Sequence, residues 1–224
     1  MYKKLNSSLN NIPDSKGSNA YHRDKHFSKL LEFYSGRDML SKIEDQFIEL
    51  GEIVGDQLED LALTADKNSP KLLKRARDGS FTNTIKKHPD FIKLEKYAFE
   101  RFGLAAMSHR HGVFGLQQAL PPIVKYGLTF LFVQSEFGLC CPLSMTDSLT
   151  RTLRKFGEKQ LVDKFIDQLT SQNLDELFQG AMFMTEQHAG SDVGSINTYA
   201  EKLDGKWYLT GDKWFCSNPD ADLA

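Results

Sequence analysis

A run of residues near the carboxyl end of the chain combines a hydroxyl, a carboxylate and a flexible turn. Thr185 and Glu186 follow a short apolar segment, and Gly190, Ser191 and Asp192 come soon after. Gly190 permits close approach of the backbone to a ligand, and Ser191 offers both an N–H and a hydroxyl. Such a turn suits a phosphate or the polar edge of a ring. Because Gly, Ser and Asp also make ordinary turns, the spacing alone leaves both interpretations open.

A hairpin is predicted to carry the chain back toward this turn. Residues 196–203 and 206–210 are rich in strand-forming side chains, and the Asp204-Gly205 pair between them favours a tight primed turn. The aromatic pair Trp214-Phe215 follows, and then the hydroxyl of Ser217. An aromatic surface beside a hydrogen-bond donor suits a stacked ring. The two segments together therefore predict one half of a flavin site.

In order and spacing, these residues resemble the middle domain of acyl-CoA dehydrogenases. The resemblance rests on Thr185-Glu186, Ala189-Gly190-Ser191-Asp192, Gly211-x-Lys213 and Phe215-x-Ser217-Asn218. It extends less sharply over residues 37–224, and its specific motifs lie in about the last 45 residues. Gln187 stands where the family usually has proline, and the segment 173–178 replaces a shorter turn. Both departures resemble the adaptive-response alkylation branch of the family.

The resemblance implies FAD as the cofactor and gives each residue a role. Residues 182–185 would form a strand beside the flavin, with Thr185 at its pyrimidine edge, and Ser217 would bond flavin N5. Gly190 and Ser191 would meet the pyrophosphate and border the acyl-thioester channel. The implied cofactor-binding residues are Met182, Phe183, Met184, Thr185, Gly190, Ser191, Phe215, Cys216 and Ser217, and Ser191 is also the implied substrate-binding residue.

The implied activity is formation of an α,β double bond in an acyl-CoA thioester. The glutamate base is expected beyond residue 224, so no catalytic residue is assigned and the chain alone is expected to be inactive. The resemblance also implies a homo-oligomer, a homotetramer when complete, formed through a carboxy-terminal domain. An alternative is a flavoprotein with a binding role, such as nucleic-acid protection, and vestigial dehydrogenase chemistry. A third interpretation is a helical scaffold alone.

Composition indicates a cytoplasmic protein without a membrane-spanning segment. The chain has 224 residues, 40% of them hydrophobic, which is enough for a sizeable core. Its formal net charge of -2 gives no overall attraction to nucleic acid or to an anionic membrane. The three cysteines have no metal-ligand spacing and are expected to be reduced thiols.

The predicted fold class is α+β. An amino-terminal all-α helical bundle is expected to be followed by the first strands of a β-barrel-like domain, which is truncated. Residues 1–35 are polar and predict a mobile arm, or else a segment ordered by a neighbouring subunit. Residues 36–178 predict a helical domain, and residues 179–224 the start of an incomplete flavin-binding β domain. Apolar spacing predicts helices over residues 38–61, 144–156 and 158–169, and a further helix after Pro89 with Asp90 as its cap. A helix from Pro121 toward Phe137 is expected to be the buried central one. Strand character is expected from Phe178 onward.

Three further clusters have competing interpretations. The triplet His109-Arg110-His111 suggests a metal site, but adjacent alternation does not place two imidazoles on one helical face, so no metal is expected. Basic residues from Lys71 to Arg77 predict a solvated helix end, or else a phosphate or nucleic-acid contact. Cys140 and Cys141 are expected to be small buried residues, with a redox pair as the alternative.

Overall fold

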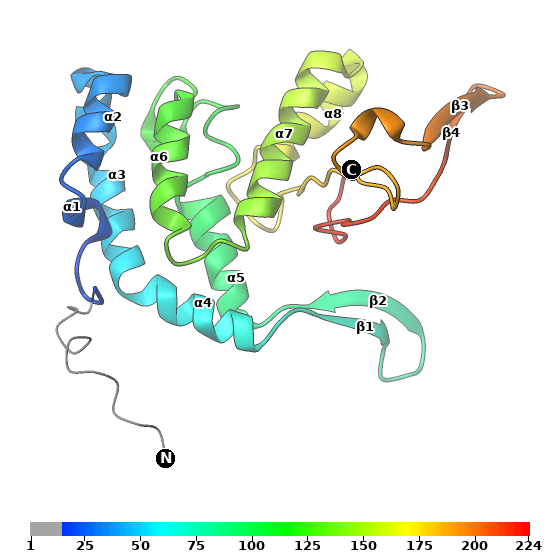
Figure 1. Ribbon diagram of the computed structural model, residues 1–224, viewed down its shortest axis with the longest axis horizontal. Helices are drawn as coiled ribbons and strands as arrows, with labels where there is room; N and C mark the ends of the chain where they lie inside the picture. Colours follow the sequence, from blue (N-terminus) through cyan, green and yellow to red (C-terminus); the bar gives the residue numbers. More distant parts are fainter. Residues whose placement is uncertain (1–14) are drawn as a thin grey trace.

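A computed structural model describes residues 15–224 of the chain, and the first 14 residues of the predicted arm lie outside that part. Most of the fold is helical, with two separate antiparallel hairpins (Figure 1). The elements are α1 (Ala20–Arg23), α2 (Phe27–Ser35), α3 (Arg37–Gly55), α4 (Gln57–Lys67), β1 (Lys71–Arg75), β2 (Phe81–Lys86), α5 (Pro89–Glu95), the π-helix η2 (Lys96–Arg101), the short 3-10 turn η3 (Val113–Gly115), α6 (Pro122–Phe132), α7 (Cys140–Phe156), α8 (Lys159–Leu169), the 3-10 turn η4 (Val193–Ser195), β3 (Tyr199–Leu203) and β4 (Lys206–Thr210).

Residues 20–35 differ from the predicted mobile arm, because they form α1 and α2 and pack on the core. Asn19 caps α1 by accepting hydrogen bonds from Tyr21 N (2.9 Å) and His22 N (3.2 Å). The ring of Tyr21 lies 5.6 Å from that of Phe47 on α3, and Phe27 lies 5.9 Å from the same ring. The few apolar residues of this segment thus fall where α3 can bury them.

The predicted long helix over 38–61 is divided into α3 and α4 at Asp56. Gly55 O accepts a hydrogen bond from Gly17 N at 2.7 Å, so this carbonyl is used by another segment. A Cβ on Gly55 would lie 1.9 Å from Ser18 O, so only glycine permits this approach. The break in the helix is therefore where the amino-terminal segment crosses it.

The helices on either side of residues 102–121 also differ in detail from their prediction. His88, not Asp90, caps α5, since its Nδ1 accepts a hydrogen bond from Asp90 N at 3.2 Å. Helix α6 ends at Phe132 instead of continuing toward residue 137. It is buried on one side only, because Tyr126 and Phe130 are exposed. Residues 96–101 form the π-helix η2 directly after α5.

The basic cluster from Lys71 to Arg77 lies on a hairpin, so the predicted helix end is wrong. Strands β1 and β2 pair antiparallel, and Ser80 N and Oγ both donate to Asp78 Oδ1 in the connecting turn (3.0 and 2.7 Å). Nearly every side chain of the hairpin is exposed, including Leu72 and Phe81. In Figure 1 the hairpin extends away from the helices.

The carboxy-terminal part contains the predicted hairpin but no regular strand over residues 178–186. Asp204 and Gly205 both have positive φ (48° and 78°) between the paired Leu203 and Lys206, as a primed turn requires. Before it, only isolated bridges form, Gly180 with Leu223 and Glu186 with Ala189.

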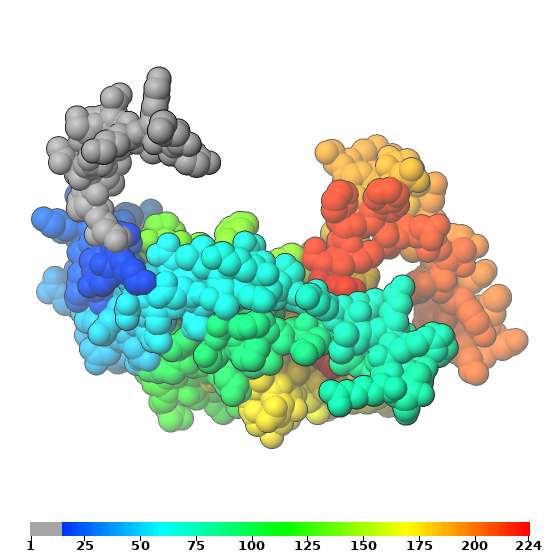
Figure 2. Space-filling view, turned by 90° about the horizontal axis from the view of Figure 1, so that it is seen from below, coloured from blue at the N-terminus to red at the C-terminus, as the bar shows by residue number. Residues whose placement is uncertain are grey.

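The predicted α+β class is confirmed as a helical amino-terminal part with small antiparallel sheets. Figure 2 shows the carboxy-terminal segment, orange to red, projecting at the end opposite α2 and α3. In the described part of the chain, no helix has the length and apolar character needed to cross a membrane.

Candidate functional site

The candidate site is built from two segments that run side by side, residues 179–186 and 213–223. Trp214 N donates to Thr185 O at 2.8 Å, and Ala181 N donates to Leu223 O at 2.8 Å. The side-chain amide of Asn218 bonds Gly180 O at 3.2 Å. The β3–β4 hairpin therefore returns the chain to the Thr185 segment, as its sequence predicted.

Helix α7 anchors the beginning of this site. Gly180 N donates to Thr146 Oγ1 at 3.0 Å, inside the helical body. A Cβ on Gly180 would lie 3.0 Å from both the Leu149 side chain and the Thr146 backbone, so the close approach favours glycine. The site is thus attached to the helices through a buried hydrogen bond.

Glu186 is the hydrogen-bonded centre of the turn. Its Oε1 accepts hydrogen bonds from Lys213 Nζ (2.8 Å) and Thr198 N (3.0 Å), and its Oε2 accepts one from Asn197 N (2.7 Å). The residue is 4% exposed, and His188 Nε2 lies 3.7 Å from Oε2. The hydrogen bond from Lys213, together with the backbone donors, lowers the pKa of Glu186 although burial opposes ionisation. Glu186 is therefore a fixed carboxylate that holds the turn together.

Several hydroxyls in the two segments and after the Glu186–Ala189 turn are left free for a ligand. Within the described residues, the hydroxyls of Thr185, Ser191 and Ser217 have no hydrogen-bond partner. The Phe215 side chain is 82% exposed, and a Cβ at Gly190 would meet nothing within 4 Å. An uncovered aromatic ring with unpartnered hydroxyls near it fits one wall of a flavin site.

The remaining predicted residues have mixed environments. Met182 and Met184 are exposed and Phe183 is half-buried. Met184 O already accepts a hydrogen bond from Lys213 Nζ at 2.9 Å, so only its N–H is left for a flavin. The Cys216 thiol donates to Lys213 O at 3.5 Å within its own turn. Gly190 and Ser191 are exposed and follow the turn that Glu186 and Ala189 close with reciprocal backbone hydrogen bonds of 3.0 and 3.1 Å.

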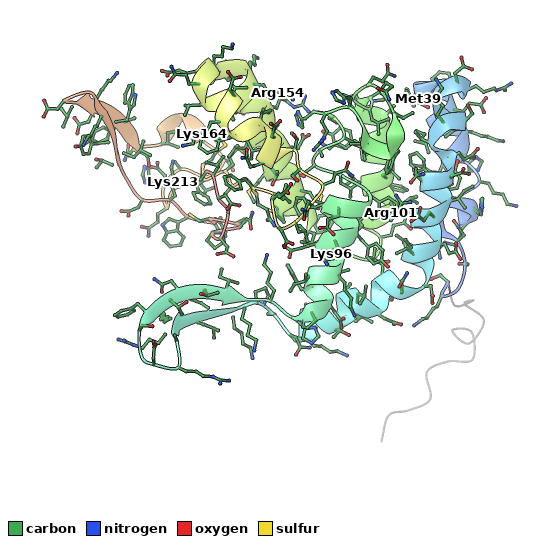
Figure 3. The ribbon with its side chains drawn as sticks, turned by 180° about the vertical axis from the view of Figure 1, so that it is seen from behind. Met39, Lys96, Arg101, Arg154, Lys164 and Lys213 are labelled. Carbon is green, nitrogen blue, oxygen red and sulfur yellow. The ribbon has the colours of Figure 1, made fainter. Side chains whose placement is uncertain are left out.

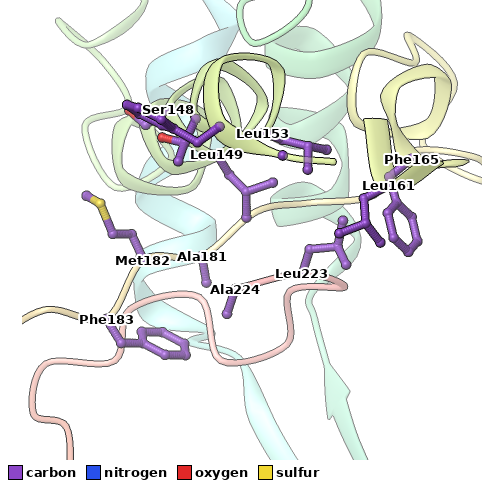
Figure 4. A pocket seen from close by; sticks show the side chains of 13 residues that line it. Ser148, Leu149, Leu153, Leu161, Phe165, Ala181, Met182, Phe183, Leu223 and Ala224 are labelled. Carbon is purple, nitrogen blue, oxygen red and sulfur yellow. The ribbon is translucent and has the colours of Figure 1, made fainter. Parts of the chain in front are cut away.

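Sequence reasoning missed an apolar groove beside these segments. Figure 4 shows it between α7, α8 and residues 181–183, and its volume is about 580 Å³. The lining residues include Leu149, Leu153 and Phe156 of α7 and Leu161 and Phe165 of α8. Their helical spacing was the signal that could have found it, because it leaves an apolar stripe on each helix. The groove borders Met182 and Phe183, so it opens beside the predicted flavin wall.

One member of the His109-Arg110-His111 triplet, His109, belongs to a buried ionic network. His109 Nε2 and Lys125 Nζ each lie 2.8 Å from a different oxygen of Asp147, whose side chain is buried. Burial opposes ionisation of Asp147, but the hydrogen bonds from His109 and Lys125 outweigh it and lower the pKa of that carboxyl. The described residues contain no group of three His, Cys, Asp or Glu side chains that could hold a metal ion.

The cysteines are free, and the pair at 140–141 differs from its prediction. Cys140 is half-buried and Cys141 is exposed, so the expectation of two buried residues is wrong. Both lie at the first turn of α7, where side chains of adjacent residues diverge.

Helical amino-terminal elements, a Thr-Glu and Gly-Ser turn, and a returning Phe-x-Ser segment together define a protein of the acyl-CoA dehydrogenase class. The family profile described as "Adaptive response protein AidB N-terminal domain" matches residues 10–176. The chain belongs to this family.

Comparison with known proteins agrees with this assignment. Acyl-CoA dehydrogenase family member 11 of Caenorhabditis elegans is 26% identical over 211 residues, which cover 92% of this chain and 34% of the relative. AidB of Escherichia coli (strain K12) is 29% identical over 192 residues, covering 80% of this chain and 34% of that protein. The crystal structure of C. elegans ACDH-11 in complex with C11-CoA superposes with a TM-score of 0.76 at 24% identity, covering 99% of this chain and 37% of that chain. The chain spans about a third of the length of these curated relatives.

Proposed function

We propose that this chain supplies one wall of the flavin site of an FAD-dependent acyl-CoA dehydrogenase-like oxidoreductase, which forms an α,β double bond in an acyl-CoA thioester. The observation that carries the proposal is the pairing of the Thr185 segment with the Phe215 and Ser217 segment through Trp214 N and Thr185 O. That pairing leaves an exposed aromatic ring and free hydroxyls on adjoining segments.

Each residue has a definite part in the proposal. When bound, FAD supplies the acceptor for a hydride and a proton is removed from the thioester by a base. Phe215 packs against the ring system, and the hydroxyls of Thr185 and Ser217 donate hydrogen bonds that favour added negative charge. Gly190 and Ser191 hold the pyrophosphate, and Ser191 borders the thioester. Glu186 is not proposed as the base, because Lys213 and two backbone amides occupy its oxygens and lower its pKa, which weakens its affinity for a proton.

The substrate class is proposed from the groove and from a relative. The apolar groove beside Met182 suits a hydrocarbon chain. ACDH-11 of C. elegans was crystallised with C11-CoA. We therefore infer an acyl-CoA thioester as substrate, with the catalytic glutamate contributed by another part of the whole protein. A homotetramer in the cytoplasm completes the proposal.

The visible absorption spectrum of the purified whole protein tests the cofactor. We expect the visible absorption of an oxidised flavin, and bleaching of that absorption when an acyl-CoA is added anaerobically. A colourless protein that takes up no added FAD would refute the flavin site. A yellow protein that no acyl-CoA reduces would retain the cofactor but overturn the proposed reaction.

A binding role is the second candidate, and the β1–β2 hairpin favours it. Its exposed cations include Lys71, Lys74, Arg75 and Arg77, with Asp78 as the acidic residue of the turn. Titrating a short DNA duplex at two salt concentrations tests this role, because phosphate contacts weaken steeply with salt. Loss of binding in Lys74→Gln/Arg75→Gln, with Lys155→Gln on α7 as control, would support the hairpin. Equal binding by all three proteins would exclude it.

A further inference from the structure

A second pocket lies on α7 and α8 and shares no lining residue with the apolar groove. Its volume is about 390 Å³, and its lining includes His109, Arg110 and His111 of the loop before α6, Arg154 of α7 and Asp167 of α8. Figure 3 labels Arg154, well separated from Lys213 of the flavin-type turn. A pocket of this size suits a small molecule.

The loop that forms one side of this pocket is closed and locally strained. Leu120 N donates to Met107 O at 2.7 Å, which joins the two ends of the loop, and Gly112 N donates to Leu116 O at 2.6 Å. Phe114, a residue with a bulky side chain, has φ of 53° between Gly112 and Gly115, both also at positive φ. Such backbone geometry is maintained only where the surrounding contacts fix it. The loop therefore holds its side chains in a set position.

Two arginines converge on the pocket from different elements. Arg154 Nη2 donates to His109 O at 2.6 Å, and Arg110 Nη1 donates to Thr170 O at 2.9 Å. Each guanidinium has five N–H donors, so one carbonyl leaves most of them free. These two anchors fix the direction of the guanidinium groups while keeping donors available. Guanidinium groups form charge-assisted and frequently bidentate hydrogen bonds with phosphate oxygens, so two fixed arginines suit a phosphate group.

His109 adds a buried, partly unpartnered group to the pocket wall. Its side chain is 3% exposed, and its Nε2 is bonded to Asp147. Its Nδ1 has no hydrogen-bond partner within the described residues. The ring is therefore held through Nε2, and Nδ1 remains available to a ligand in the pocket.

We propose that this pocket binds the phosphate group of a small phosphate monoester. Arg110 and Arg154 contact the phosphate oxygens, with His109 and His111 beside them. Asp167 is the one carboxylate in the lining, and together with Gln117 it offers acceptors to hydroxyl groups of the ligand. The lining carries two arginines against one aspartate, so the site favours an anion.

Glycerol 3-phosphate, inorganic phosphate and acetate are the probes, each titrated at constant ionic strength into the isotope-labelled chain. We expect saturable shifts of the backbone amide signals of residues 109–119 with both phosphates, tighter for glycerol 3-phosphate, and no saturation with acetate. Equal binding of acetate would overturn the phosphate assignment. Binding to phosphatidic acid vesicles without saturable binding of glycerol 3-phosphate would overturn the small-molecule assignment.

Matched variants separate a built site from general charge attraction. Arg154→Gln should weaken glycerol 3-phosphate binding about tenfold or more, the size expected when a hydrogen bond to a charged group is lost. Lys155→Gln removes the same charge from the neighbouring position of α7, where the ammonium lies over the Phe156 ring, and should leave binding unchanged. Asp167→Asn, an exposed change without a structural partner, should tighten binding of inorganic phosphate, which lacks the glycerol hydroxyls that Asp167 accepts from and is only repelled by its charge. Equal losses in Arg154→Gln and Lys155→Gln, or no gain in Asp167→Asn, would refute the site.

Discussion

Lys213 Nζ lies 2.8 Å from Glu186 Oε1, so one ion pair joins the predicted flavin turn to the segment that returns from the β3–β4 hairpin. The same lysine donates to Met184 O, and the same carboxylate accepts hydrogen bonds from Asn197 N and Thr198 N. Both side chains are largely withdrawn from solvent. The geometry of the turn therefore depends on the charge of Glu186.

Glu186→Gln is expected to loosen this turn in a pH-dependent way. The folded state lowers the pKa of Glu186 below its ordinary value of 4.5, so its stabilising contribution is fully present above that value and is lost as pH falls through the folded-state pKa. Amide hydrogen exchange at Asn197 and Thr198 should be faster in the variant near neutral pH. The difference from wild type should shrink in acid. His188 faces the same carboxylate, so His188→Gln is measured in parallel to separate its contribution from that of Lys213.

The control for this experiment is Glu201→Gln on the exposed strand β3. It removes the same charge from the hairpin that follows the turn, without any of the contacts of Glu186. Unchanged exchange in Glu186→Gln, or an equal change in Glu201→Gln, would mean that the ion pair does not hold the turn.

Asp147→Asn is expected to destabilise the helical part strongly. The change leaves Lys125 buried without its carboxylate, and breaking a buried pair in this way typically costs about 3 kcal/mol. Because the folded pKa of Asp147 is lowered, the loss should be largest above the ordinary carboxyl pKa and should diminish in acid. Urea unfolding measures it. As the control, Asp163→Asn breaks an exposed pair with Lys159 and should change the free energy of unfolding by less than about 0.5 kcal/mol. Equal losses of stability in Asp147→Asn and Asp163→Asn would show that the Asp147 network does not stabilise the fold as a buried ion pair.

Gly127→Ala and Gly190→Ala are expected to act on different properties. A Cβ at Gly127 would lie 2.8 Å from Leu31 Cδ2 and 3.0 Å from Phe47 Cε1, so the variant should lose roughly 1–3 kcal/mol of stability by overpacking. A Cβ at Gly190 meets nothing, so its variant should unfold like wild type. In the whole protein, Gly190→Ala should instead weaken FAD binding. Unaltered stability in Gly127→Ala would contradict the packing of α2 on α3 and α6.

Local patterns predicted those parts of the fold whose cause is local. Asp204 and Gly205 specify a primed turn by their own backbone preferences, and the apolar spacing of α3 marks its buried face. The division at Asp56 could not be predicted in this way. It depends on Gly17 N reaching Gly55 O from a segment far away in the chain.

In the candidate site, too, the contacts between segments far apart in the chain could not be predicted from local sequence patterns. The Thr185 and Phe215 segments were identified from residue types, but their alignment depends on the hydrogen bond from Trp214 N to Thr185 O. The network of Asp147 with His109 and Lys125 was missed, because its members are separated along the chain and no short motif connects them. A long-range ion pair leaves no local sequence pattern.

Titration of FAD into the chain of residues 1–224 should show no saturation at low micromolar concentrations. Phe215 is 82% exposed, and Met182 and Met184 are also exposed, so the proposed flavin-binding residues would cover one side of a flavin only. Tight cofactor sites bury most of the ligand surface. Fluorescence quenching of added FAD measures the binding. Yellow protein of equal stoichiometry after gel filtration would contradict this expectation.

Ser217→Ala in the whole protein gives the sharpest test of the flavin wall. If the Ser217 hydroxyl, which has no partner within the described residues, bonds flavin N5, its loss removes a donor that favours the reduced ring. A lost hydrogen bond to a charge-bearing group is worth about 1.5–3 kcal/mol, so the two-electron potential should fall by roughly 30–65 mV. The dissociation constant for oxidised FAD should change much less, because Phe215 still packs against the ring. Ser217→Thr retains the hydroxyl and should restore the potential. An unchanged potential in Ser217→Ala would show that Ser217 does not contact N5, whatever the affinity for FAD.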